Sequence, residues 1–344
     1  MNAMKHAAGR YLQALVMGKG NPELAAAFAE GQGQWLDRPV VVAALKAAVA
    51  GTVSGDFSGA RSTISDAFLE AMRGDSIPLR LAMRRVPMHT RIYANTSGVL
   101  ASQIAQGAPI PVLKGTWTPT TLTPKKCAGL VVQTEELAKS TDPGAPLALV
   151  DDLAKAVAAE ENRTFLSPTV TGSILDGAPN FASTGATVTG VDADLRALVD
   201  RVPAAFRAGT VFVMTMETAV YLGTLRDTTG AAAYPNIGPQ GGVLLGLPVL
   251  ITDACMEPGS PPTRIIALVA ASEIYWAQGG VELLSSTQAT LEMTDAPTGN
   301  SATGNAGTTS LVSMFQANAV ATRAIRESAW YAKSGSTAWL TTSY

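Results

Sequence analysis

One stretch decides the fold of this chain: PGAPLALVDDLAKAVAAEENRTFLSP, which runs from Pro143 to Pro168. Its apolar residues recur at steps of three and four, so the pattern predicts a long amphipathic helix with one face toward a core. Pro146 suits the first turn of such a helix, and Pro168 ends it. The residues of the expected core face are Leu147, Val150, Ala154, Val157, Ala158 and Phe165.

Composition predicts a folded protein with a substantial core. The chain has 344 residues, of which 47% are hydrophobic, and this is enough for two domains. Its formal charge of −2 gives no general attraction for nucleic acid. Cys127 and Cys255 lie far apart and are expected to pack as small apolar residues in a reducing cytoplasm. No apolar run is long enough to predict a membrane span, and the first residues favour an amphipathic helix over a signal peptide.

Residues 1–87 predict short helices. Thr63 and Asp66 resemble a capping box that would begin the last of them, with Gly74 at its end. The markers of these helices are Leu12, Leu15 and Val16 for the first, Leu24, Ala27 and Phe28 for the second, Val41 to Val49 for the third, and Ile64, Phe68 and Met72 for the fourth.

Residues 88–123 have a different texture, because Thr, Val and Ile are interrupted here by Gly and Pro. This pattern predicts a long β-hairpin with its turn region at Gly107 to Pro111. Such an arm has too few apolar residues for a core of its own, so it must lie on another surface. A second copy of the chain is the expected partner, and the expected contact residues are Ile110, Lys114 and Trp117.

The rest of the chain predicts an alternating α/β order. Asp192 is a plausible N-cap for a helix that carries Leu195, Leu198, Val199 and Val202, and Leu311 to Ile325 fits either a strand or a helix. Aromatic residues near the end of the chain predict that the C-terminal segment packs against the rest of the protein. They are Trp330, Tyr331 and Trp339. Other expected elements are strands at Lys125–Thr134, Thr210–Met214, Leu247–Ile251, Arg264–Val269 and Val281–Leu284, a helical turn at Glu135–Ala138, and a helix at Glu217–Arg226.

A search for catalytic chemistry finds no constellation that could carry it. The two histidines do not form a zinc-hydrolase pattern, and neither glycine cluster fits a phosphate or dinucleotide loop. We therefore expect no catalytic, cofactor-binding or metal-binding residues. The arginines Arg80, Arg84 and Arg85 are expected on a solvated face or in ion pairs. Three pairs of adjacent acidic residues are expected on solvated faces or in ion pairs between subunits. They are Glu135-Glu136, Asp151-Asp152 and Glu160-Glu161.

Five segments in a fixed order resemble a known family. They are QGAPIPVLKGTW (Gln106 to Trp117), LTPKKCAGLVVQTEEL (Leu122 to Leu137), the long helix described above, LRDTTGAAAYPNIGPQGGVLLGLPVLITD (Leu225 to Asp253) and SLVSMFQANAVATRAIR (Ser310 to Arg326). Together they resemble the major capsid proteins of tailed bacteriophages with the Hong Kong 97 fold. The resemblance extends over most of the chain.

The resemblance implies an α+β fold with an N-terminal arm, an extended β-hairpin loop, a peripheral domain built on a long spine helix, and an axial domain. The implied boundaries are 1–87 for the N-terminal helical segment and arm, 88–123 for the extended loop, 124–189 with 281–326 for the peripheral domain, 190–280 for the axial domain and 327–344 for the C-terminal segment.

The implied function is that of a non-enzymatic head protein, which self-assembles into hexamers and pentamers of an icosahedral shell around the double-stranded DNA of a phage or prophage. The implied location is the virion, after assembly in the host cytoplasm. Implied partners are the chain itself, a portal protein, a possible scaffold or decoration protein, and packaged DNA by weak, non-specific contact. No cofactor and no membrane is implied.

Three details qualify the resemblance. Gln106-Gly107 stands where many relatives have Glu-Gly, so a charge pair to a neighbouring capsomer is not expected there. Met1 to Ser54 is short for a scaffolding region, so its removal by a protease is not expected.

Some relatives join a lysine of the extended loop to an asparagine of a neighbouring subunit. Lys114 is the only lysine of the arm, but residues 296–325 contain no carboxylate that could take the proton from its ammonium group. A shell without covalent bonds between subunits is therefore expected.

The competing hypothesis is a cytoplasmic α/β enzyme whose site is not recognisable from the sequence. The hairpin arm discriminates between the two, because a monomeric enzyme would leave it uncovered.

Overall fold

The computed structural model describes residues 2–32, 35, 37–47, 60–97, 103, 116–138, 144–207, 209–257, 263–293 and 311–342. Contacts divide the chain into two compact units. Unit 1 comprises Met1–Asp75, Lys126–Ala158 and Gly280–Arg326. Unit 2 comprises Ser76–Lys125, Ala159–Gly279 and Glu327–Tyr344.

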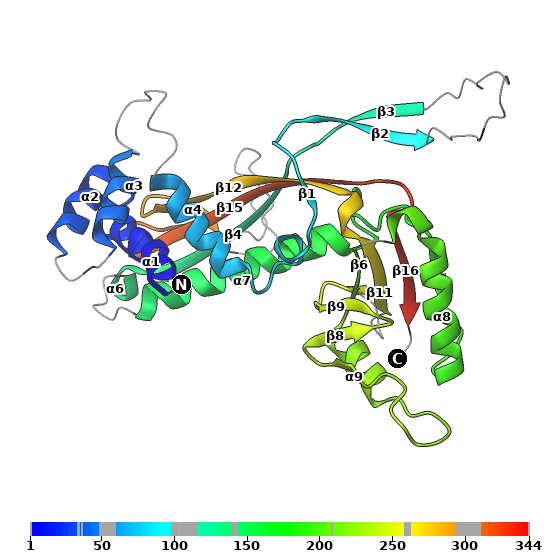
Figure 1. Cartoon of the computed structure of the whole chain (residues 1–344). Coiled ribbons are helices and arrows are strands. Elements are labelled where there is room, and N and C mark those ends of the chain that lie inside the picture. The colour runs from blue at the N-terminus through cyan, green and yellow to red at the C-terminus, as the bar shows by residue number, and fades with distance from the viewer. Residues whose placement is uncertain are drawn as a thin grey trace. The chain divides into compact units, whose positions relative to one another are not determined.

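Helices and strands both contribute to the described part of the chain (Figure 1). The helices are α1 (Asn2–Met17), α2 (Pro22–Gly31), α3 (Arg38–Ala47), α4 (Ala60–Met72), α5 (Ile77–Arg80), α6 (Glu135–Ala138), α7 (Gly144–Leu166), α8 (Val188–Arg201) and α9 (Met216–Thr224), with 3-10 turns η1 (Ala204–Phe206) and η2 (Ala271–Glu273). The strands are β1 (Arg84–Arg85), β2 (Arg91–Ser97), β3 (Thr116–Thr121), β4 (Lys125–Thr134), β5 (Asn180–Ala182), β6 (Thr210–Met214), β7 (Ile237–Gly238), β8 (Gly241–Leu244), β9 (Leu247–Ile251), β10 (Met256–Glu257), β11 (Thr263–Ala270), β12 (Ile274–Ser286), β13 (Thr290–Glu292), β14 (Leu311–Ser313), β15 (Ala319–Ala332) and β16 (Thr337–Thr342).

The predicted long helix is α7. Pro146 lies in its first turn, as expected, and the helix ends at Leu166, two residues before Pro168. Val150 and Val157 are buried in unit 1, where α7 packs on β4. That packing needs a glycine at position 129, because an added Cβ would lie 2.8 Å from a methyl carbon of Leu153 and 3.3 Å from one of Val157. The missing side chain therefore lets the strand approach the helix closely.

In unit 1, the helices α1 to α4 pack together and against the ends of two strands. Val16 of α1 and Val320 of β15 form a small buried cluster, and Ser65 Oγ of α4 accepts a 2.9 Å hydrogen bond from the backbone N–H of Val281 in β12. Two sequence predictions are wrong in detail here. Helix α4 begins before Thr63, so Thr63 lies inside the helix and is not its cap. Helix α2 buries three alanines and leaves Leu24 exposed, because its apolar face is turned by one residue from the expected one.

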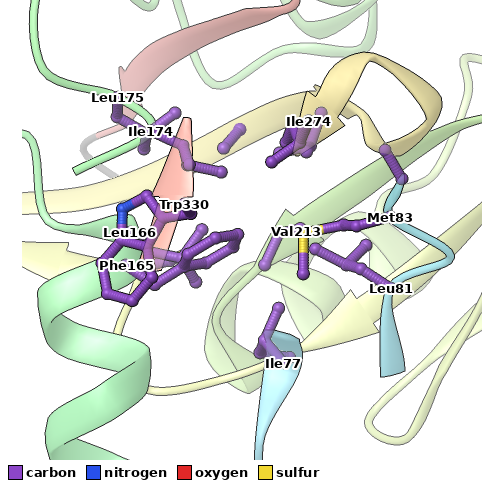
Figure 2. Packing of buried hydrophobic residues seen from close by; sticks show 14 of the residues in the cluster. Ile77, Leu81, Met83, Phe165, Leu166, Ile174, Leu175, Val213, Ile274 and Trp330 are labelled. Carbon is purple, nitrogen blue, oxygen red and sulfur yellow. The ribbon is translucent and has the colours of Figure 1, made fainter. Parts of the chain in front are cut away.

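In unit 2, an eight-stranded sheet has β5-β16-β11-β6-β9-β8-β7 as its main order, with β10 paired to β11. Side chains alternate across it as the period of a strand requires. On one face, Phe212, Met214 and Leu268 pack beneath α8 and α9. On the other face, Val213 and neighbouring residues join a second core (Figure 2), which also contains Ile77, Leu81, Met83, Phe165, Leu166, Ile174, Leu175, Ile274 and Trp330.

Phe165 and Trp330 link the end of α7 to β15 within this second core. Their ring centroids lie 5.2 Å apart with an interplanar angle of 83°, an edge-to-face contact visible in Figure 2. Trp330 is buried and Trp339 of β16 packs against the same cluster, so the prediction that the terminal aromatic residues pack on the body is confirmed.

Most predicted strands appear, and three (β4, β6 and β9) have the predicted bounds. The ambiguous segment Leu311 to Ile325 forms strands, β14 and part of β15. The predicted cap of α8 is wrong: the helix begins at Val188, and the side chain of Thr187 accepts a hydrogen bond from the N–H of Gly190. Asp192 lies inside α8, where its carboxylate accepts a 2.6 Å hydrogen bond from the hydroxyl of Tyr234.

Candidate assembly interface

Strands β2 and β3 form the predicted hairpin arm within unit 2 (Figure 1). They pair antiparallel, with Tyr93 opposite Pro119 and Asn95 opposite Trp117. Because directly opposed residues share a face and successive residues alternate, Tyr93, Trp117 and Pro119 lie on one side of the arm. The predicted turn region, Gly107 to Pro111, lies outside the described residues.

This side of the arm, which we call the aromatic face (Arg91, Tyr93, Trp117 and Pro119), is open to solvent. Tyr93 is 59% exposed and Trp117 is 57% exposed. The guanidinium of Arg91 lies 5.9 Å from the centroid of the Tyr93 ring, within the range of a cation–π contact. Two large exposed aromatic side chains and a cation on one hairpin face are typical of a binding surface.

The opposite side of the arm is anchored at its base. Ile92 and Leu122 are buried and cluster with Ala277 of β12 and Ala329 of β15. The arm therefore has one face held by unit 2 and one face without a partner in the described chain.

The chain that enters the arm is fixed by a strand pairing and by charge. Strand β1 pairs in parallel with β12, and the N–H of Val86 donates a 2.9 Å hydrogen bond to the carbonyl oxygen of Trp276. Arg84 lies 3.3 Å from a carboxylate oxygen of Glu273, and Lys333 also pairs with that carboxylate. We call Arg84, Glu273 and Lys333 the root cluster.

Aromatic rings extend the root cluster. The guanidinium of Arg84 lies 5.7 Å from the ring of Tyr275, and the ammonium of Lys333 lies 5.9 Å from the same ring. Because Glu273 is only 9% exposed, its carboxylate is partly removed from water, and contact with these two cations offsets part of that cost. The expectation that this arginine-rich segment serves ion pairs is confirmed for Arg84.

The predicted site residues have different outcomes. Trp117 is exposed on the arm, whereas Ile110 and Lys114 lie outside the described residues. Sequence reasoning missed Tyr93, which the two-residue period of the arm could have placed on the same face as Trp117 once the register was known. It also missed Glu273, which no sequence signal connects with Arg84 and Lys333.

The acidic doublets of α7 behave in two ways. Asp151 pairs with Lys155 and Glu160 pairs with Arg163 at the helix surface, and the hydrogen bond from Arg163 lowers the pKa of the Glu160 carboxyl. Glu161 contradicts the expectation of a solvated face, because it is fully buried and accepts a 2.9 Å hydrogen bond from the hydroxyl of Ser76. The hydroxyl compensates part of the cost of burying this polar group.

Both cysteines are buried, as expected for cysteines that pack as small apolar residues. Burial alone raises the pKa of the Cys255 thiol far above its usual range. Among the described residues, no three His, Cys, Asp or Glu side chains gather in a way that could hold a metal ion. No helix in the described part of the chain is long and apolar enough to cross a membrane.

Solved structures of two phages and of a GTA particle share this fold. A chain of Mycobacterium phage Ogopogo is 15% identical, with a TM-score of 0.58 over 78% of this chain and 92% of its own. A chain of Gordonia phage Cozz is 16% identical, with a TM-score of 0.55 over 76% and 85%. The capsid of a native GTA particle is 15% identical, with a TM-score of 0.54 over 80% and 90%. At these identities the likeness defines the fold, which is the α+β capsid fold expected from the sequence.

Comparison of the amino-acid sequence with known protein families identifies the family of this chain. A family model described as the phage capsid family matches residues 59–329, and the chain belongs to this family. A capsid polyprotein of Pseudomonas phage PAJU2 is 34% identical over 307 residues, which cover 83% of this chain. The match covers 45% of the polyprotein, so the chain spans less than half the length of this relative.

Proposed function

We propose that the chain is the major capsid protein of a tailed phage or prophage, and that its copies form hexamers and pentamers of an icosahedral shell around double-stranded DNA. In this proposal the arm lies on a neighbouring copy and buries its aromatic face there. The protein acts by assembly and carries out no reaction.

The observation that carries the proposal is the asymmetry of the arm. One side is held by Ile92 and Leu122, while Tyr93 and Trp117 are more than half exposed on the other. A two-stranded hairpin is marginal by itself, and an exposed aromatic pair adds an apolar surface that favours association. Membership of the phage capsid family makes another copy of the chain the natural partner.

The finer parts of the proposal follow the family resemblance. The proposed domains are a peripheral domain at 124–189 and 281–326 and an axial domain at 190–280, preceded by the N-terminal segment and the extended loop. The proposed further partners are a portal protein, a scaffold or decoration protein, and packaged DNA through weak non-specific contact. The formal charge of −2 supports a weak DNA contact, because few phosphates can be neutralised. The proposed place of assembly is the host cytoplasm.

Deleting residues 101–116 tests the role of the arm. The variant is expected to keep a cooperative melting transition, because the cores of both units lie outside the deleted segment. It is expected to form no shells by size-exclusion chromatography and negative-stain imaging, because the arm can no longer reach its partner.

A second variant replaces the same residues by a Gly-Ser segment of equal length. It separates the loss of side chains from the shortening of the connection. Normal particles from either variant would show that the arm is not needed for assembly.

A further inference from the structure

The turn between β8 and β9 contains a residue that folding alone does not favour. Leu244 pairs with Leu247, so the strands are joined by the two residues Leu245 and Gly246. Both have positive φ, 51° for Leu245 and 81° for Gly246. Two-residue turns of this kind prefer Asn-Gly, because a leucine side chain crowds the backbone in the left-handed region.

Leu245 gains little in return within its own chain. Its side chain is 56% exposed, so burial does not offset the strained backbone. A strained residue that its own fold does not require is grounds for a functional hypothesis.

Leu245 lines a cavity of about 380 Å³ in unit 2. Leu247 and the buried Leu268 contribute apolar walls, and Arg196 of α8 contributes a cation. Among the described residues Arg196 makes no ion pair, whereas the neighbouring Arg207 lies 3.4 Å from Asp200. The site therefore combines apolar walls with a guanidinium available to an anion. The remaining lining residues are Val199, Thr210 and the paired Asp200 and Arg207.

A surface of complementary character lies at the other end of β6. Thr210 begins this strand beside the cavity, and Met214 ends it two residues before α9. The first turns of α9 expose Met216 and Val220, which are 51% and 39% exposed and four residues apart on one helix face. Glu217 lies between them in sequence and is 59% exposed, with Arg264 contacting its Oε2 atom.

We infer that the cavity beside Leu245 receives the first turns of α9 from a second copy of the chain, with Met216 against the apolar walls and Glu217 near Arg196. The two surfaces lie at opposite ends of one strand, so the contact is head-to-tail. Contacts of this kind close into rings when the rotation between copies allows it. The inference rests on the proposed function, and it names a second contact that is independent of the arm.

Leu245→Asn provides the first test. Asparagine suits the left-handed turn, so the melting temperature of the unassembled protein is expected to rise by about 2–4 °C. The protein concentration needed for assembly is expected to rise about tenfold, because the leucine contact is lost. If Leu245 served folding alone, the substitution would not raise the melting temperature and weaken assembly at the same time. Unchanged assembly by Leu245→Asn would overturn the inference and leave the shell function standing.

Lys19→Asn is the matched control. Lys19 also has a positive φ, 53°, and also precedes a glycine of positive φ, but it lies in the α1–α2 turn of unit 1. This variant is expected to gain stability in the same way and to assemble like the wild type.

A disulfide provides the second test and does not depend on shells. Met216→Cys combined with Leu245→Cys is expected to give covalent multimers on a non-reducing gel after mild oxidation, and these should vanish with a reductant. The Leu245→Cys single variant is the control and should remain a monomer on the gel. A double variant that also remains monomeric would overturn the proposed pairing of these two surfaces, whatever particles the wild type forms.

Discussion

Trp117 is the single side chain on which the assembly argument depends most. It is 57% exposed on a hairpin whose other face is anchored by Ile92 and Leu122. Large aromatic residues that become fully desolvated often contribute most of the free energy of an interface. Its role can therefore be separated from folding by substitution.

Trp117→Ser is expected to leave the melting temperature almost unchanged, because a half-exposed side chain contributes little to the fold. The concentration needed for assembly should rise about thirtyfold, which corresponds to the loss of about 2 kcal/mol per contact. Light scattering across a series of protein concentrations measures the concentration at which assembly begins. Leu24→Ser is the control, since Leu24 is 59% exposed on α2, outside residues 59–329. Equal assembly by both variants would contradict the role of Trp117.

Val157 tests the buried face of α7. It is 1% exposed, so Val157→Asp would place a carboxylate without a designed partner in the core at a cost of several kcal/mol. A typical domain has only about 5–15 kcal/mol of stability in total, so insoluble protein is expected.

Ala156→Asp is the matched control for this substitution. Ala156 lies on the exposed side of the same helix, so the variant should lose only the small difference in helix propensity and stay soluble. The soluble yield of the two variants measures the contrast. A soluble and fully assembled Val157→Asp would show that this face tolerates charge.

At the scale of elements, the direction of the arm depends on residues distant in sequence. Strand β1 enters the arm and is held beside β12, while Glu273 binds both Arg84 and Lys333. A carboxylate that is only 9% exposed and shared by two cations limits how far this entry can move. The root cluster thus positions the arm without belonging to the surface that touches a partner.

Glu273→Gln is expected to loosen the arm more than it destabilises the fold. The loss of charge leaves two cations close together, at a cost of about 1–2 kcal/mol given their partial exposure. Spin labels at Pro119→Cys and Asp200→Cys, both in unit 2, should give a broader distance distribution in this variant. Glu70→Gln, which removes a surface ion pair with Arg73, is the control. An unchanged distribution would argue against a positioning role.

At the scale of the whole molecule, the question is whether copies are joined covalently. A lysine ammonium with a reference pKa near 10.4 needs a carboxylate to take its proton before it can attack an asparagine. The segment 296–325 has no such group in sequence. The fold brings the N–H of Glu135 to 2.9 Å from the carbonyl oxygen of Asn318, but Glu135 has a further interaction of its own.

We therefore expect one band near the monomer mass when assembled particles are boiled in SDS. A ladder of multimers that disappears in both Lys114→Ala and Glu135→Gln would instead show a covalent shell assisted by Glu135. The same gel run with a reductant excludes disulfides of Cys127 or Cys255 as the cause of any ladder.

The sequence by itself determined those helices and strands that are marked by residues close together in the chain. The spacing of apolar residues, with Pro146 in the first turn and Pro168 after the end, was enough to locate α7. The alternation of Thr, Val and Ile with Gly and Pro in residues 88–123 was enough to predict the arm. The strands β4, β6 and β9 were found with their correct bounds, because short apolar runs between turn residues define a strand locally. The order of the five motifs along the sequence was enough to indicate the family.

Only the tertiary structure decided the properties that depend on residues far apart in the chain. It placed Glu273 between Arg84 and Lys333, buried Glu161 against Ser76, and moved the start of α8 to Val188. It also set Leu245 beside Arg196 at one cavity. The physical reason is that helix and strand periodicity reflect neighbours within a few residues, whereas ion pairs, burial and cavities depend on which distant segments the fold brings together.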